Sequence, residues 1–457
     1  MSIETEKNTM TLIDELTNQI KDIILEGKKT GQLKPQKENY RKWTLNNFKY
    51  TDKGVESTGA SGETVTRDHW FPITIALNEI IDKSNAFVKL VEKSKPILPD
   101  FAKDIIDNFA RKIALYCLNN EQWNDEEIEK IKLVLIKELN DEPIKSSIEV
   151  ELLGIALRSK KIKISNNVSI RQTTKEDLER EVPEHSFGYM EHFEYPSAIL
   201  SMENYSTGRT IDQMKELKAI TILRLFKVGS VKYISAKRSS ETLRMYFGGT
   251  SFPHDKTPSF ITALVKESEE KLLCHFWENI EQKIPISFLR ISLKDSSYSD
   301  IAYHRYSDAL IKEGTDESRI TNAMMGLESV YLKDEGEIQE LSYRLQLRVA
   351  KLISQFGYEP FEVTRIIKDA YDVRSKFVHG GLLNYKARAK LADKYGSMQN
   401  LITKILDFLR LTVISSIMID MDKEELIDTI DKSFLDAKFQ DRLEQFIVPT
   451  KNIIELK

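Results

Sequence analysis

The chain has 457 residues and the composition of an ordinary folded protein, with 41% hydrophobic and 30% charged residues. It is about three times as long as a typical domain, so two or three hydrophobic cores are expected. Only 12 prolines and 18 glycines are present, which excludes a long disordered tract. The 67 basic and 71 acidic residues give a net charge of -4, which argues against a broad surface for polyanions but allows a local basic site.

The two cysteines, Cys117 and Cys274, fall in regions that are assigned below to different domains. This pattern argues against a disulfide framework and a thiolate metal cluster, and it fits a reducing compartment. The N-terminus shows no basic leader with an apolar segment behind it, and hydroxyl side chains interrupt the longest apolar stretch, residues 411–419. We therefore expect a cytoplasmic protein that is not attached to a membrane and needs no cofactor or metal.

The first part of the chain is expected to be helical. Residues 50–67 are rich in glycine, serine, threonine and charge, which is typical of a loop. On either side of this loop, apolar residues recur at helical spacing, in residues 11–26, 71–94, 100–118 and 125–139. These patterns predict a helical N-terminal domain over residues 1–145.

The hydrophobic period then changes to that of strands. Within residues 160–172, apolar residues stand at alternate positions on both sides of Asn166 and Asn167, which indicates two strands and a tight turn. A helix is expected at 210–225, and further strands are expected at 147–157, 197–201, 229–237 and 242–246. We predict a mixed α+β middle domain over residues 146–290 with a sensing or regulatory role.

The last third of the chain returns to helical spacing. Glycine, alone or with proline, stands where helices should begin or end, as at Gly357 and at the pair Gly380 and Gly381. The expected helices are 297–313, 317–333, 337–355, 359–379 and 397–420, followed by an amphipathic pair at 423–433 and 436–447. The predicted fold class is α+β and multidomain, ending in an all-α helical bundle over residues 291–457.

Among the seven histidines, only His379 lies at the end of an expected helix, with a glycine pair directly after it and a basic residue, Arg374, before it. It occupies the last turn of an expected helix, where the negative end of the helix dipole favours the cationic form of the imidazole. Arg374 precedes it by five residues, about 140° around an ideal helix, so the two side chains do not share one face. A site that uses both would combine the side chains of two copies of the chain.

The spacing of these two residues is weak support for a site when it is taken alone. A cationic side chain in the last helical turn is commonly only a capping charge. Arg180 and His185 have the same spacing, but Pro183 between them breaks any helix. Further features of the sequence are needed to favour a catalytic role.

Three such features resemble the Apea-like branch of the HEPN superfamily. Residues 300–310 are similar to the first helix of that branch, and residues 319–332 are similar to its helix with a Leu-Glu pair, here Leu327 and Glu328. Residues 371–381 are similar to its signature, an arginine followed after four to six residues by histidine and usually glycine. The order and spacing of all three features agree across about a third of the chain.

The resemblance implies a helical bundle that dimerises so that the arginine and histidine motifs of two protomers face each other. Many such domains are metal-independent ribonucleases of antiviral-defence or toxin systems. On this chain, His379 would be the general acid or base for attack of an RNA 2′-OH on the neighbouring phosphate, and Arg374 would bind that phosphate. The position after the arginine is often Asn, Asp or His in active members and is Ser375 here, a departure that favours reduced activity or a purely binding role.

Several neighbouring residues have a supporting role in this hypothesis. Glu328 either forms a hydrogen bond with Arg374 or is a solvated glutamate on a helix face. Lys376 either contacts RNA or is an ordinary surface lysine, and Tyr371 is more typical of a core than of a base-stacking surface. The expected partners are an RNA substrate, a second copy of the chain, and a regulatory protein or phage-derived trigger. The alternative is a catalytically silent module that binds RNA, nucleotide or protein.

Overall fold

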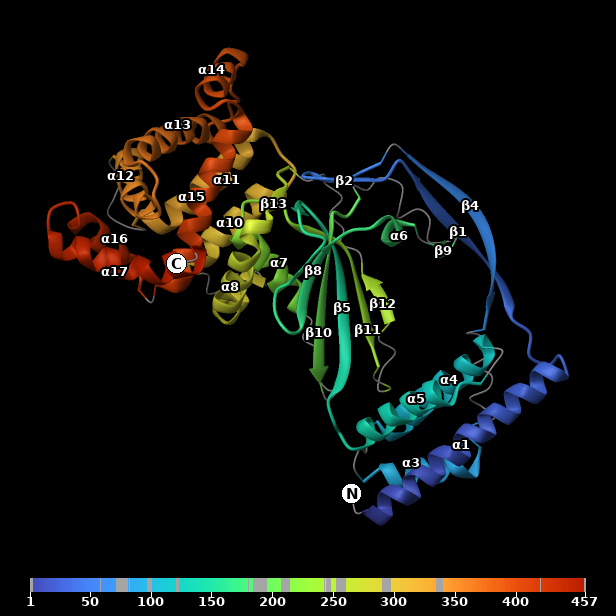
Figure 1. Cartoon of the computed structure of the whole chain (residues 1–457). Coiled ribbons are helices and arrows are strands. Elements are labelled where there is room, and N and C mark those ends of the chain that lie inside the picture. The colour runs from blue at the N-terminus through green and yellow to red at the C-terminus, as the bar shows by residue number, and fades with distance from the viewer. Residues whose placement is uncertain are drawn as a thin grey trace.

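The computed structural model shows an N-terminal group of helices, a central sheet and a C-terminal helical bundle (Figure 1). None of the described helices is long and apolar enough to cross a membrane. The structure describes residues 3–57, 59–70, 81, 83–96, 101–120, 123–179, 181–183, 195–206, 214–241, 243, 248–251, 260–289, 297–333, 340–419 and 421–455.

The N-terminal helices have a hydrophobic core of their own. Apolar residues at helical spacing, such as Leu16 and Phe109, are fully buried between them. The Lys28 ammonium donates to the Cys117 carbonyl at 2.9 Å, near the C-terminal end of one helix. The helices are α1 (Ile3–Lys29), α3 (Asn85–Ser94), α4 (Ala102–Asn119) and α5 (Asp125–Leu139). Their positions confirm the helical predictions for this part of the chain, except that residues 71–80 and 82 lie outside the described residues.

The loop predicted at residues 50–67 is wrong, because this segment belongs to an antiparallel β-ribbon. The two long strands are paired in register from Gln36 opposite His69 to Asn46 opposite Gly59. Polar side chains occupy most of both faces, so the ribbon is held mainly by backbone hydrogen bonds and gives no hydrophobic alternation. Its strands are β1 (Gln36–Asn46), β2 (Lys49–Thr51), β3 (Gly54–Glu56) and β4 (Gly59–His69).

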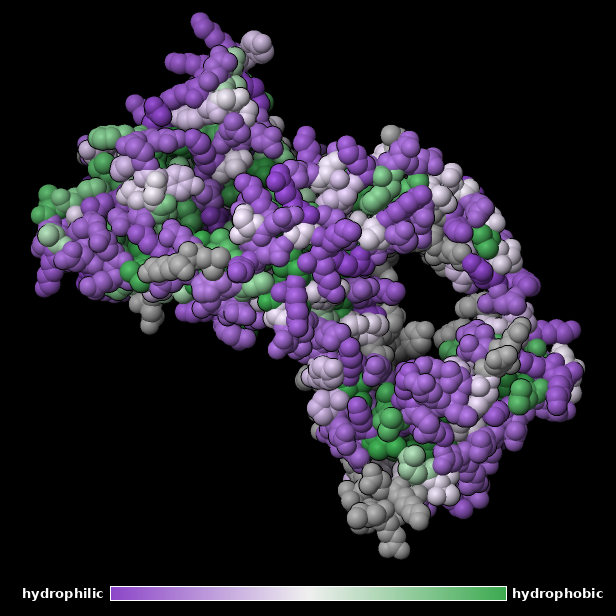
Figure 2. All heavy atoms as spheres, viewed as in Figure 1, coloured by the Kyte–Doolittle hydropathy of each residue, from purple (hydrophilic) through white to green (hydrophobic). Residues whose placement is uncertain are grey.

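This ribbon forms an arm between the N-terminal helices and the central sheet, and Figure 2 shows that it spans an opening in the molecule. The far end of the arm is fixed by contacts with the middle of the chain. The Tyr50 hydroxyl accepts a hydrogen bond from the Leu157 amide at 3.0 Å, and Arg158 forms an ion pair with Asp52 at 2.8 Å. The middle of β1 pairs with the short strand β9 (Glu181–Pro183).

The central sheet is antiparallel and has the strand order β12-β11-β5-β10-β8-β7. The tight turn at Asn166 and Asn167 is confirmed, because the two flanking strands pair. Residues 242 and 244–246 of the predicted last strand lie outside the described residues. The strands are β5 (Ile144–Leu153), β7 (Lys161–Lys163), β8 (Val168–Gln172), β10 (Ala198–Ser206), β11 (Lys232–Ser240) and β12 (Gly248–Ser251). A separate parallel pair joins β6 (Ile155–Leu157) to β13 (Ala263–Val265). The helices of this part are α6 (Lys175–Leu178), α7 (Lys215–Phe226), α8 (Glu270–Ile280) and α9 (Ile286–Leu289). Two 3-10 turns, η2 (Glu267–Glu269) and η3 (Glu281–Lys283), flank α8.

The described residues of the C-terminal third are mainly helical, as predicted, while residues 337–339 and 420 of the predicted helices lie outside the described residues. Its helices begin at polar caps such as Ser297, which forms a capping box with Asp300. They are α10 (Tyr298–Ile311), α11 (Asp316–Tyr331), α12 (Leu341–Ile353), α13 (Pro360–Val378), α14 (Tyr385–Tyr395), α15 (Met398–Met418), α16 (Lys423–Lys432) and α17 (Ala437–Ile454), with the 3-10 turn η4 (Ser354–Phe356). Helix α14 was not expected from the sequence.

One continuous hydrophobic core joins the sheet to the bundle. Its buried residues run from Ile148 in β5 to Ile453 in α17. Polar contacts reinforce the junction at the C-terminal end of α7, where the Tyr306 hydroxyl donates to the Arg224 carbonyl at 2.8 Å and Arg410 donates to the Leu225 carbonyl at 2.9 Å. These donors satisfy carbonyls that have no partner within the helix. The bundle is therefore supported by the sheet, while the N-terminal helices form a separate core.

Candidate functional site

Helix α13 positions the predicted site, and its boundaries follow from local sequence. The helix begins at Pro360 after the Glu359 side chain has accepted hydrogen bonds from the first turn. It ends at His379, because Gly380 adopts a φ of 83° and donates to the Phe377 carbonyl while Gly381 donates to the Lys376 carbonyl. This pair of hydrogen bonds is a Schellman motif. The prediction that the glycine pair ends the helix at His379 is confirmed.

Arg374 lies on the side of α13 that faces α11. Its guanidinium donates to Glu328 Oε2 at 3.0 Å and lies 5.7 Å from the centre of the Tyr371 ring, within range of a cation–π contact. The side chains of Arg374 and Glu328 are only 26% and 16% exposed. The hydrogen bond that was considered for Glu328 is therefore present, and Tyr371 supports the same guanidinium.

The Glu328–Arg374 pair is electrostatically unusual. Burial raises the pKa of the Glu328 carboxyl above its ordinary value, and the charge and hydrogen bond of Arg374 only partly oppose this increase. The Nε atom of Arg374 is buried and has no hydrogen-bond acceptor. Buried donors without an acceptor are rare in proteins, so this N–H is an unusual feature of the pair.

His379 lies in a different environment from Arg374. The imidazole is exposed at the end of α13, and Lys376 is also exposed, whereas Ser375 is half-buried. Within the described chain, no hydrogen bond, ion pair or ring contact connects His379 with Arg374. One copy of the chain thus brings Arg374, Glu328 and Tyr371 together, and it leaves His379, Ser375 and Lys376 outside that group.

Helix α14 follows α13 in the chain and adds a basic and partly apolar projection to the bundle. Arg388 fixes this helix to α11 through Glu317 at 2.8 Å, and Lys394 fixes it to α13 through Asp369 at 2.6 Å. Lys386 and Lys390 in the same helix are both exposed and form no ion pair with a residue that the structure describes. Figures 1 and 2 show α14 projecting from the bundle with a mainly hydrophilic surface.

Exposed apolar side chains accompany these charges. Val378, Leu382 and Tyr385 are 53%, 62% and 89% exposed around the end of α13. The sequence contains a signal for this projection, because residues 385–395 carry four basic side chains. In the structure, none of the side chains of this helix is fully buried. The described residues contain no group of three or more His, Cys, Asp or Glu side chains that could hold a metal ion.

Comparison with known proteins does not assign the chain to a family. No family model, curated protein or solved structure matches it. The likeness of the C-terminal third to the Apea-like HEPN branch therefore stays a prediction from the sequence.

Proposed function

We propose that the C-terminal bundle is a HEPN-type endoribonuclease that acts without a metal ion and cleaves RNA by attack of a 2′-OH group. The observation that carries the proposal is that one helix, α13, carries both an arginine that is held in place and a histidine that is exposed. Glu328 and Tyr371 hold Arg374 in place, while His379 is open to a substrate on the helix end.

The proposed reaction divides between these two side chains. A histidine removes the proton of the 2′-OH, whose oxygen attacks the adjacent phosphorus and forms a 2′,3′-cyclic phosphate. The bond from phosphorus to the 5′-oxygen breaks, and that oxygen receives a proton from a protonated histidine. Arg374 stabilises the charge that develops on the phosphate oxygens.

The reaction requires a second copy of the chain, because Arg374 and His379 are not in contact within one copy. A symmetric dimer through the ends of α13 would place His379 of one protomer near the Arg374 of the other. The exposed side chains of Val378 and Leu382 would be covered by such an interface. Lys376, Lys386 and Lys390 would then contact the phosphates on either side of the cleaved bond.

A second function is favoured by one observation, the charge balance at Arg374. Glu328 already pairs with this guanidinium, and Ser375 replaces the residue expected in active relatives of the HEPN type. A bundle of this kind that binds RNA, nucleotide or protein without cleaving it is the alternative. In either case, we propose a cytoplasmic effector of antiviral defence or a toxin, in which the first two parts of the chain sense a regulatory protein or phage-derived trigger.

Incubation of the full-length protein with end-labelled single-stranded RNA in EDTA separates the two functions. We expect cleavage products with 2′,3′-cyclic phosphate and 5′-OH ends, and no cleavage of DNA of the same sequence, because DNA lacks the nucleophile. Retarded RNA without cleavage would support the silent module. Cleavage that requires magnesium, or equal cleavage of DNA, would contradict the proposed reaction.

A further inference from the structure

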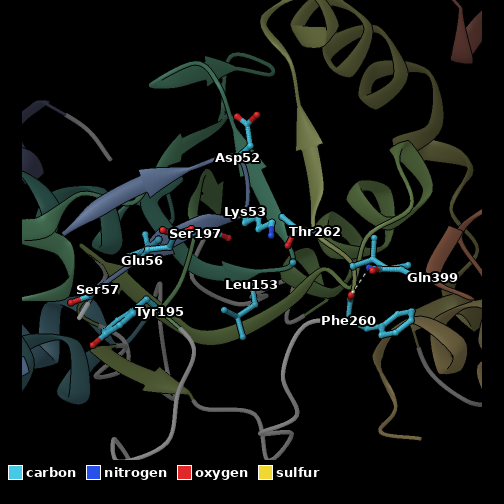
Figure 3. A pocket seen from close by; sticks show the side chains of 13 residues that line it. Asp52, Lys53, Glu56, Ser57, Leu153, Tyr195, Ser197, Phe260, Thr262 and Gln399 are labelled. Carbon is cyan, nitrogen blue, oxygen red and sulfur yellow. Dashed lines mark hydrogen bonds between the residues drawn. The ribbon is translucent and has the colours of Figure 1, made fainter. Parts of the chain in front are cut away.

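A cavity of about 900 Å³ lies where the arm, the sheet and the bundle meet (Figure 3). The arm contributes the β2–β3 turn, the central part contributes the end of β5 and the segment before β13, and the bundle contributes the first turn of α15. This volume is at the upper end of the range for small-molecule sites. The cavity is lined by Asp52, Lys53, Val55, Glu56, Ser57, Leu153, Gly154, Tyr195, Ser197, Phe260, Ile261, Thr262 and Gln399.

The elements that form this cavity are closely packed against each other at two glycines. Gly54 has a φ of 103°, and a Cβ at this position would lie 2.7 Å from the Cβ of Ser197, so the turn of the arm approaches the sheet more closely than another residue allows. Gly154 has a φ of 71°, and its Cβ would lie 2.2 Å from the Ser230 carbonyl oxygen. Ser197 donates to the Ile155 carbonyl on the same wall. The cavity is therefore formed by fixed elements before any ligand binds.

The cavity is lined by one cationic side chain, Lys53, and by two carboxylates, Asp52 and Glu56. Asp52 forms an ion pair with Arg158 at 2.8 Å, and Glu56 accepts a hydrogen bond from Thr51 at 3.1 Å. Lys53 forms no ion pair with any residue that the structure describes. In Figure 3 its ammonium lies toward Thr262, and the Asp52 carboxylate points away from it. Lys53 is therefore available to a phosphate, and Glu56 adds a carboxylate that no described cation neutralises.

Other lining residues provide groups that would contact an anion or a nucleobase. Gln399 lies in the first turn of the 21-residue helix α15, whose positive dipole end attracts negative charge. Its amide nitrogen donates to the Phe260 carbonyl at 3.2 Å, which fixes the side chain and leaves the amide oxygen to accept from a ligand. Tyr195 provides an aromatic ring, and Leu153 provides an apolar surface. Both are suited to contact with a nucleobase.

We propose that this cavity binds a nucleoside phosphate, with the phosphate at Lys53 and the base between Tyr195 and Leu153. The site is separate from the Arg374 and His379 region, and the proposal does not depend on RNA cleavage. Because Lys53 belongs to the arm and Gln399 to the bundle, the bound molecule would bridge the N-terminal and C-terminal parts of the chain. It would strengthen the contact of the arm with the rest of the protein.

Calorimetric titration of the full-length protein with AMP, GMP, CMP and UMP tests the proposal, with adenosine and inorganic phosphate as partial ligands. We expect at least one nucleotide to bind with one site per chain, and to bind more tightly than either partial ligand. Lys53→Ala is expected to weaken that binding about tenfold or more, as loss of a charge-assisted hydrogen bond does. Lys49→Ala is the matched control, because Lys49 is an exposed lysine on the same ribbon but outside the cavity, and its affinity should stay unchanged.

The proposal is overturned if none of the four nucleotides binds at millimolar concentration, or if Lys53→Ala and Lys49→Ala bind like the unmodified protein. Equal affinity for adenosine and AMP would also overturn it, because the phosphate would then contribute nothing. Melting curves establish that both variants are folded, and Lys53→Gln replaces Lys53→Ala if the latter does not fold. Hydrogen exchange provides a second readout: nucleotide should slow exchange at residues 49–57 and 397–402 in the unmodified protein and leave it unchanged in the Lys53 variant.

Discussion

The side of helix α13 that faces α11 and the C-terminal end of this helix differ in whether their side chains have partners within the same chain. The side that faces α11 holds Arg374 between Glu328 and Tyr371, and both partners of the ion pair are largely buried. The C-terminal end exposes His379 together with Val378 and Leu382, and no described residue of the chain covers them. One side is thus arranged within a single molecule, whereas the other is available to RNA or to a second copy. Substitutions on the two sides should therefore have different consequences for stability.

The largest expected effect comes from His379→Ala on the exposed end. RNA cleavage should fall about 10²- to 10⁴-fold, because a positioned histidine contributes that much to proton transfer. The free energy of unfolding should change by no more than about 1 kcal/mol, which is the usual range for a capping cation. Single-turnover cleavage and melting curves measure the two quantities. His185→Ala is the control, since it has the same spacing from an arginine, and unchanged cleavage by His379→Ala would remove the proposed role.

Arg374→Ala should produce a comparable but more complex effect on the buried side. Cleavage should decrease about 10²- to 10³-fold through the loss of charge stabilisation. The variant should also be less stable, by about 1 to 3 kcal/mol, because Glu328 is left largely buried without its partner. Urea unfolding measured beside His379→Ala checks the difference. Equal stability of the two variants would show that the two sides of α13 do not differ as described.

Assembly provides the third test, because only the exposed end is expected to depend on a second copy. Light scattering at micromolar concentration should give about twice the chain mass of 52.9 kDa. Leu382→Asp should shift the protein toward monomer and lower cleavage in parallel, since it places a charge on the exposed apolar surface. Mixing inactive Arg374→Ala and His379→Ala proteins should restore part of the activity. A strictly monomeric protein with activity linear in concentration would exclude the composite site.

The smallest expected effect is a pH dependence that belongs to the buried side alone. The pKa of Glu328 is raised on folding, so the folded chain binds a proton at pH values where the unfolded chain has released it. Stability should therefore decrease as pH rises from the usual range of a glutamate to this raised pKa. Glu328→Gln should lack this part of the slope in urea unfolding between pH 4 and pH 7. An identical slope in both proteins would assign the dependence to another group.

Much of the C-terminal bundle was predictable because its helix ends are determined by residues that are close together in the sequence. A capping side chain such as Ser297, or a glycine such as Gly380, fixes a boundary through neighbours only a few residues away. The end of α13 at His379 follows from such local rules. The functional assignment does not, since two side chains five residues apart on a helix carry the same spacing whether they act as caps or as catalysts.

The remaining features depend on contacts between distant residues. The arm has polar residues on most of both faces, so its pairing leaves no hydrophobic period in the sequence. Helix α14 is attached by ion pairs to Asp316 and Glu317 in another helix, and its apolar residues are only partly buried against the core. The partnership of Glu328 with Arg374 joins positions 46 residues apart, and the cavity joins Lys53 to Gln399. Neither arrangement follows from the periodicity of one segment.

Among the described residues, the core of the N-terminal helices contains one from far along the chain, Leu243. This side chain is 2% exposed among those helices, and its backbone is bound on both sides, by Glu138 at 3.0 Å and by Asn108 at 2.8 Å. During synthesis on the ribosome, the helices at the beginning of the chain are therefore complete in sequence about a hundred residues before their core is complete. A nascent chain of that length would present an unfilled apolar site to chaperones, and the N-terminal part would reach its final stability only after most of the central sheet has emerged.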